Sequence, residues 1–240
     1  MPITAKKHFD DDIARAWSIY QHTQLQLSVQ NSDKKLCNDL MLSAVAMSVG
    51  AMDAYLCDAY VDCLSSSLRA YAQGKWPGTF PSGYKKQPLP AGEVLNNTRA
   101  NRPLWSIRMA ARKVMERENI LSISRIDDLF NPILPAGKKL WPDFIAVLIA
   151  HNRIRFTRHT KSTTAGLKGK KLDDANKQAV AALKSRIAYI VQLRHDWIHN
   201  CSRPKSSITK LTKLKAHSAI RDIHILIDEL DKHIESNRII

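Results

Sequence analysis

The segment at residues 172–201 reads LDDANKQAVAALKSRIAYIVQLRHDWIHNC. Wound as a helix at about 100° per residue, it places its apolar side chains along one side, within about 60° of Arg194. These apolar residues are Val180, Leu183, Ile187, Ile190, Val191, Trp197 and Ile198. The pattern predicts a long amphipathic helix packed on a helical core. Arg194 stands inside the apolar stripe, where a charge is costly unless it is paired.

Two histidines follow Arg194 at the edge of this stripe. His195 and His199 are spaced i, i+4, so we expect their side chains to stack one turn apart. An arginine and two histidines at the rim of an apolar face require an anion, a partner chain or a reaction to explain them. A structural interpretation also remains open. In it, Arg194 pairs with a core acid such as Asp53 or Asp58, and the histidines are satisfied core or surface residues.

Composition indicates one all-α domain over residues 1–240. Hydrophobic residues make up 44% of the chain, enough for a core, while only 8 of 240 residues are glycine. Residues 73–101 contain four prolines and four glycines without lasting periodicity, so we expect a long loop insertion there. Trp76, Phe80 and Tyr84 are candidates to pin this insertion to the body. The fold class expected from these features is a helical bundle with a long irregular insertion.

Apolar periodicity and capping residues predict the other elements. The second of the expected helices follows a break and cap at 31–33, and its middle, 40–56, is apolar nearly all round. Gly50 in this stretch is expected to allow close helix approach. We expect a basic loop at 160–171, a turn at 202–205, and further helices at about 10–29, 33–72, 102–118, 124–130, 141–159 and 206–234.

Acidic residues on the expected helix 33–72 offer a weak metal signal. Asp53, Asp58 and Asp62 are predicted to lie nearly on one face, which could coordinate a metal. Solvated or salt-bridged carboxylates are the favoured interpretation, so we expect no metal site and no cofactor. Asp196, next to the histidines, is interpreted as a salt-bridge partner of a nearby arginine rather than a catalytic acid.

Positive charge is concentrated in the second half of the chain. The net charge is +15, and residues 150–221 hold 17 Lys and Arg against 3 acids, which leaves +14 in that block. A basic block of this size favours binding of a polyanion, with RNA or DNA as the first candidate. A solvated basic face without a partner is the alternative.

Cysteine spacing and hydropathy indicate a soluble protein of a reducing compartment. None of the four cysteines, Cys37, Cys57, Cys63 and Cys201, has the spacing of a zinc site. The N-terminus lacks the apolar core of a signal peptide, and the longest uncharged apolar run, 40–52, is too short to span a bilayer. We expect a cytoplasmic protein with structural thiols and no membrane association.

The stretch 194–199 resembles the Arg-polar-x3-to-5-His signature of HEPN-superfamily ribonucleases. In that family the motif also ends a long helix, and a short turn and a last amphipathic helix follow it. Residues 48–56 are similar to the long helix of the RiboL-PSP-HEPN subgroup, with Met52-Asp53 where a Leu-Glu-like pair is common. The resemblance covers about 35–72 and 140–235 and leaves 73–101 unmatched. Spacing alone is weak support, since two other Arg–His pairs in the chain also fit it.

This resemblance implies a metal-independent endoribonuclease that cleaves RNA by attack of the 2′-hydroxyl. It implies His199 as acid or base, Arg194 as phosphate clamp, and His195 as a polar helper. It also implies a homodimer with a composite active site, and a biological role as a toxin or antiviral-defence effector with an antitoxin or regulatory partner. Three residues that follow the motif are expected to bind the flanking RNA backbone, namely Asn200, Arg203 and Lys205.

Two other functions fit the same sequence. The first is a catalytically inactive HEPN-like module that binds or senses RNA or nucleotides, with salt-sensitive RNA affinity that survives loss of Arg194 or His199. The second is a helical interaction protein whose basic block binds an acidic partner.

Overall fold

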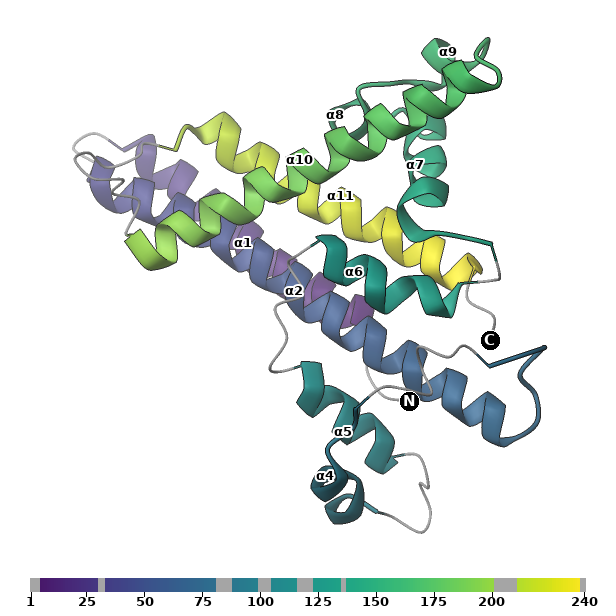
Figure 1. The fold of residues 1–240 in the computed structure, drawn as a ribbon. Helices are drawn as coiled ribbons and strands as arrows, with labels where there is room; N and C mark the ends of the chain where they lie inside the picture. The colour runs from purple at the N-terminus through teal and green to yellow at the C-terminus, as the bar shows by residue number, and fades with distance from the viewer. Residues whose placement is uncertain are drawn as a thin grey trace.

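The computed structural model describes residues 5–29, 33–80, 88–98, 105–115, 123–134, 137–200 and 211–237. Within these ranges the secondary structure is helical and no strand occurs, which confirms the predicted all-α fold. In Figure 1, helices α1 (Ala5–Leu27), α2 (Lys34–Ala72) and α11 (Lys213–Asn237) run alongside one another, and α10 (Lys170–Asn200) crosses them obliquely.

Helix α2 is the central element of the bundle. Its N-cap is Asp33, whose carboxylate accepts hydrogen bonds from the backbone N–H groups of Lys35 and Leu36 at 2.9 and 3.1 Å. Helices α1, α5 (Trp105–Met115), α10 and α11 all pack against it. By length and composition alone α2 could cross a membrane, but 56% of its most apolar window is buried inside the protein. This burial is what the core helix of a bundle requires, and α2 begins within one residue of the predicted start.

The first helix begins earlier than predicted. We expected a start near residue 10, on the acidic run there, but α1 begins at Ala5. The reason is packing, because Ala5 and Phe9 are buried and the Phe9 ring meets the Tyr55 ring edge-on at a centroid distance of 6.0 Å. Burial of an aromatic ring against α2 therefore decides where α1 starts.

The predicted single helix at 141–159 is wrong. The chain instead forms α7 (Leu140–Ala150) and the short α8 (Ile154–Thr157), separated by a turn in which Asn152 has a φ of 55°. Asparagine tolerates this left-handed conformation better than most residues. The turn redirects the chain so that Phe156 becomes buried and the following arginines reach α11.

The insertion at 73–101 is partly helical rather than wholly irregular. Helix α4 (Ala91–Asn96) forms within it and contacts α5. Trp76 and Phe80 are buried with ring centroids 5.0 Å apart, as expected of residues that pin this segment, whereas Tyr84 lies outside the described residues.

Three shorter elements complete the described chain. Helix α6 (Ile123–Phe130) is followed by a single 3₁₀ turn at Asn131–Ile133, close to the predicted short element. The expected basic loop at 160–171 contains helix α9 (Lys161–Thr164), which Thr160 and Thr163 stabilise with a reciprocal capping box. The predicted turn at 202–205 and the predicted start of the last helix lie outside the described residues.

Candidate active site

The apolar stripe of α10 is buried up to Ile190 and ends at Arg194. Four further residues of this face, at spacings of three and four, are at most 6% exposed, namely Ala175, Ala179, Leu183 and Ile187. Arg194 comes four residues after Ile190 and is partly exposed. Ile198 was predicted to continue the stripe but is 50% exposed, so the buried face ends before it. Arg194 therefore stands where α10 leaves the core.

Asp53 of α2 is the acid that faces Arg194. Burial raises the pKa of the Asp53 carboxyl, and the nearby Arg194 charge lowers it without cancelling the effect of burial. Asp53 Oδ1 is buried and accepts no hydrogen bond from any residue that the structure describes, and Arg194 forms no ion pair with another described residue. The carboxylate is close enough to influence Arg194 electrostatically, yet it does not hold the guanidinium in a hydrogen-bonded pair.

The two histidines of the motif lie as predicted. The His195 and His199 ring centroids are 4.5 Å apart, and the ring planes are inclined by 44°. Both side chains are exposed, and neither forms a hydrogen bond or an ion pair with another described residue. Their ring nitrogens are therefore accessible for proton transfer to a ligand at the end of α10.

The residues next to the two histidines either have a partner other than the predicted one or have side chains that the structure does not describe. Asp196 accepts a hydrogen bond from Gln192 Nε2 at 2.6 Å, one turn earlier on α10, so the predicted arginine partner is wrong for the described chain. Asn200 is the last residue of α10, and its side chain is not among those described. The other two expected RNA-binding residues, Arg203 and Lys205, also lie outside the described residues.

An open cleft of about 410 Å³ lies beside the motif. Trp197 and Ile198 form one wall, and small residues of α2 such as Ala46 and Gly50 form the other. The expectation that Gly50 allows close helix approach is wrong, because a methyl group built there would meet no atom within 4 Å. The surface beside Trp197 and Ile198 is therefore partly apolar and open to solvent.

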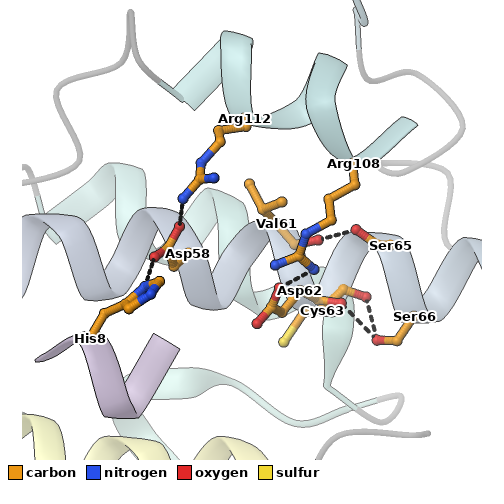
Figure 2. A network of polar contacts seen from close by, with 9 residues as sticks. All are labelled: His8, Asp58, Val61, Asp62, Cys63, Ser65, Ser66, Arg108 and Arg112. Carbon is orange, nitrogen blue, oxygen red and sulfur yellow. Dashed lines mark hydrogen bonds and ion pairs between the residues drawn. The ribbon is translucent and has the colours of Figure 1, made fainter. Parts of the chain in front are cut away.

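Asp58 and Asp62 of α2 hold helix α5 rather than a metal. Figure 2 shows Arg112 donating to Asp58 Oδ1 at 2.9 Å and Arg108 paired with Asp62, while His8 Nδ1 lies 2.8 Å from Asp58 Oδ2. The salt-bridged interpretation of these two acids is confirmed. The predicted common face is wrong for Asp53, which is two and a half turns from Asp62 and faces α10 instead.

Two buried carboxylates of α11 pair with three arginines of the basic block at 150–221. Asp222 is 1% exposed and accepts from Arg155 Nε at 2.9 Å and from Arg186 Nε at 2.7 Å. Glu229 is 3% exposed and accepts from Arg153 Nη2 at 2.6 Å. Burial opposes ionisation of Glu229, but the hydrogen bonds from Arg153 and His151 outweigh it, and its pKa is lowered.

A signal for these two acids exists in the sequence, although neither belongs to the predicted site. Asp222 and Glu229 are seven residues apart, so both lie on the face that carries the buried residues of α11. Charged residues on an apolar face predict partners of opposite charge elsewhere in the chain. The identity of the partner arginines depends on the turn after α7, and the sequence pattern did not indicate this turn.

One group of metal-ligating side chains occurs among the described residues. Ligand atoms of Asp10, His224 and Asp228 lie within 4.8 Å of one another. Lys6 Nζ already pairs with Asp10 and with Asp228, the latter at 2.9 Å, and Trp17 Nε1 donates to His224 Nδ1 at 3.4 Å. A lysine ammonium thus supplies the positive charge that these carboxylates need.

The described cysteines have the character of structural thiols. Cys37 and Cys63 are buried and Cys57 is partly buried, and none of the three forms a disulfide with another described cysteine. Burial, reinforced by the charges of Asp53 and Asp58, raises the pKa of the Cys57 thiol to about 12. A thiol that stays protonated at neutral pH is a poor nucleophile.

The end of α10 therefore offers a guanidinium without a described ion-pair partner, two adjacent imidazoles and a neighbouring cleft. Comparisons of the chain with protein-family models, with curated proteins and with solved structures find no match. The chemistry of this site is accordingly inferred from its own residues.

Proposed function

We propose that this protein is a metal-independent endoribonuclease of the HEPN type, with its active site at the end of α10. The observation that carries the proposal is Arg194, a guanidinium at the rim of the core that no described carboxylate pairs with. The stacked, exposed His195 and His199 lie within the next five residues. A cation and two proton-transfer groups at one accessible helix end suit a reaction at a phosphodiester.

Cleavage of RNA by its own 2′-hydroxyl makes three chemical demands. The hydroxyl must lose a proton, the phosphorane must be stabilised, and the leaving 5′-oxygen must gain a proton. Histidine exchanges protons near neutral pH, so His199 acts as the acid or base and His195 orients it or supplies the second transfer. Arg194 binds the non-bridging phosphate oxygens through parallel N–H donors. The products would be a 2′,3′-cyclic phosphate and a 5′-hydroxyl.

One motif helix supplies one arginine and one principal histidine, which favours a homodimer. Arg194 and His199 are five residues apart, and so point about 140° away from each other on an ideal helix. Two α10 ends that meet across a two-fold axis would combine both sets of residues in one cleft. The exposed Ile198 and the open cleft beside it support this arrangement, because they provide apolar surface next to the motif.

The biological role that suits such an enzyme is that of a toxin or an antiviral-defence effector in the cytoplasm, controlled by an antitoxin or a regulatory partner. A catalytically inactive RNA- or nucleotide-binding module is the alternative. The proximity of Asp53 to Arg194 favours it, since a phosphate must compete with this carboxylate for the guanidinium.

Incubation of the pure protein with RNA in excess EDTA tests the proposal. We expect the wild type to cleave RNA and the Arg194→Ala and His199→Ala variants to leave it intact. If both variants bind RNA like the wild type and the wild type cleaves nothing, with or without added metal or a candidate activator, the inactive module replaces the enzyme. Cleavage that requires Mg²⁺ would overturn the mechanism.

A further inference from the structure

A group of exposed cations lies at the end of α10 that is far from the motif. We call it the α9 basic surface, and it comprises Arg158, Lys161, Lys168, Lys170, Lys171 and Lys177. All six side chains are exposed, and none forms an ion pair with another described residue. Asp173 and Asp174 are the acids of this stretch, so residues 158–177 keep a net charge of +4 from six cations and two acids.

The structure divides the basic block into two classes. Arg153, Arg155 and Arg186 pair with the buried carboxylates Asp222 and Glu229 and serve the fold. The cations of the α9 basic surface have no such partners among the described residues. Their charge is therefore available to an external anion, which distinguishes them from the arginines that pack α8 and α10 onto α11.

Two of these lysines stand where a helix disfavours positive charge. Lys170 and Lys171 are the first two residues of α10, next to the positive end of the helix dipole. Acidic residues suit this position, and Asp173 fills that role in the first turn. Because the two lysines oppose the stability of the helix, an external ligand accounts for them better than the fold does.

The α9 basic surface and the motif lie at opposite ends of one rigid helix. In Figure 1, α9 adjoins the N-terminal end of α10, while the motif end lies near the start of α2. Lys171 and Arg194 are 23 residues apart, a separation of about 35 Å along the axis. A mononucleotide or a dinucleotide cannot reach both ends.

We propose that the α9 basic surface anchors the phosphate backbone of a structured RNA whose scissile bond is cut at the far end of α10. Double-stranded DNA carries a phosphate on each strand about every 3.4 Å, and an A-form RNA helix rises less than this per base pair, so spanning 35 Å requires roughly twelve base pairs or more. The substrate class is thus a folded RNA with a stem of that length. This inference rests on the proposed function in taking RNA as the ligand.

The test is a binding measurement that does not require cleavage. The variant Lys168→Glu/Lys170→Glu/Lys171→Glu is compared with Lys75→Glu/Lys139→Glu/Lys232→Glu, which reverses three exposed lysines outside the surface. Fluorescence anisotropy is recorded with two RNA hairpins of 4 and 14 base pairs, in a His199→Ala background that prevents turnover. Thermal unfolding of each variant reports on the fold.

We expect the surface variant to lose affinity for the long hairpin by about tenfold or more and to lower its salt slope by roughly two to three. The short hairpin should lose little, because it cannot span the two ends, and the control variant should lose less than about threefold on either RNA. The melting temperature should not fall, since glutamates at 170 and 171 suit the helix N-terminus.

If both variants lost RNA affinity equally, net charge alone would explain the effect and the inference would be overturned. An unchanged affinity for the long hairpin would also overturn it. Competition by poly-glutamate as strong as by RNA at equal charge would assign the surface to an acidic protein instead. Failure of the proposed function looks different, because wild-type protein would then leave RNA intact while the surface variant still weakens binding.

Discussion

Helix α10 carries an arginine beside a carboxylate in two places, a buried one at Asp222 and a partly buried one at Asp53, and the two pairs differ in geometry. In the middle of the helix, Arg186 donates from Nε to Asp222 Oδ2 at 2.7 Å, and Asp222 is 1% exposed. Two turns later Arg194 lies near Asp53 without a hydrogen bond between them. The first guanidinium is held within the fold, whereas the second makes no hydrogen bond with a described carboxylate, and in the proposed function its donors bind a phosphate. On one helix, the presence or absence of a carboxylate partner distinguishes a structural arginine from a candidate functional one more clearly than a count of charges does.

Arginine-to-alanine substitutions at the two positions should have opposite effects. Arg194→Ala is expected to reduce RNA cleavage by about 10²–10³-fold, because a donor to the phosphorane is lost, so that RNA stays intact over the time in which the wild type cleaves it. The melting temperature should stay almost unchanged. Arg186→Ala should lower the melting temperature and leave the cleavage rate of the folded protein intact. Cleavage rates and thermal unfolding of both variants, measured side by side, check this. Equal loss of stability at the two sites would break the comparison.

Removal of the carboxylate at Asp222 should cause the largest loss of stability. Asp222→Ala leaves Arg155 and Arg186 without this partner, and because their side chains are 50% and 21% exposed, solvent screens the unpaired charges and the cost is about 1–3 kcal/mol. Chemical denaturation of the wild type and the variant measures the difference. A loss below about 1 kcal/mol would mean that solvent replaces the carboxylate at this site.

Low pH should weaken the ion pairs of Glu229 with Arg153 and His151 over a defined pH range. The pKa of Glu229 is lowered in the folded protein, so its stabilising contribution is present above the unfolded value of about 4.5 and is lost as pH falls through the folded pKa. Glu229→Gln should therefore be less stable than the wild type at pH 7, and the gap should narrow below pH 4.5. Unfolding free energies measured from pH 3 to 7 test this, and a constant gap would contradict it.

The smallest expected effect is a gain in stability, opposite in sign to the losses expected at Asp222 and Glu229. Burial raises the pKa of Asp53, so its protonated form contributes stability that is lost as pH rises through the folded pKa. Asp53→Asn should raise the melting temperature at pH 7, by about 2–4 °C at most, and should gain nothing at pH 3. Lower stability of the variant at pH 7 would show that Asp53 pairs with Arg194 after all.

Local signals in the sequence predict the elements that local chemistry decides. The start of α2 follows from the Asp33 cap, and the course of α10 follows from its apolar period up to Ile190. The stacking of His195 on His199 follows from their i, i+4 spacing alone. These features need no knowledge of distant parts of the chain.

Features that depend on distant contacts were not predictable in the same way. Helix α1 begins at Ala5 because Phe9 packs on Tyr55, and α7 ends at Ala150 because the next turn brings Arg155 to Asp222. The free state of Arg194 likewise follows from where Asp53 lies on α2 relative to α10. Such contacts join residues from 46 to 141 positions apart, which no local period reveals.

The most direct test of the central claim is identification of the ends that the protein creates on RNA in excess EDTA. The account predicts that the wild type yields fragments with 2′,3′-cyclic phosphate and 5′-hydroxyl ends, and that Arg194→Ala and His199→Ala yield none. Intact RNA with the wild type under every condition, or fragments with 5′-phosphate ends, would contradict the assignment of the α10 end as the catalytic site.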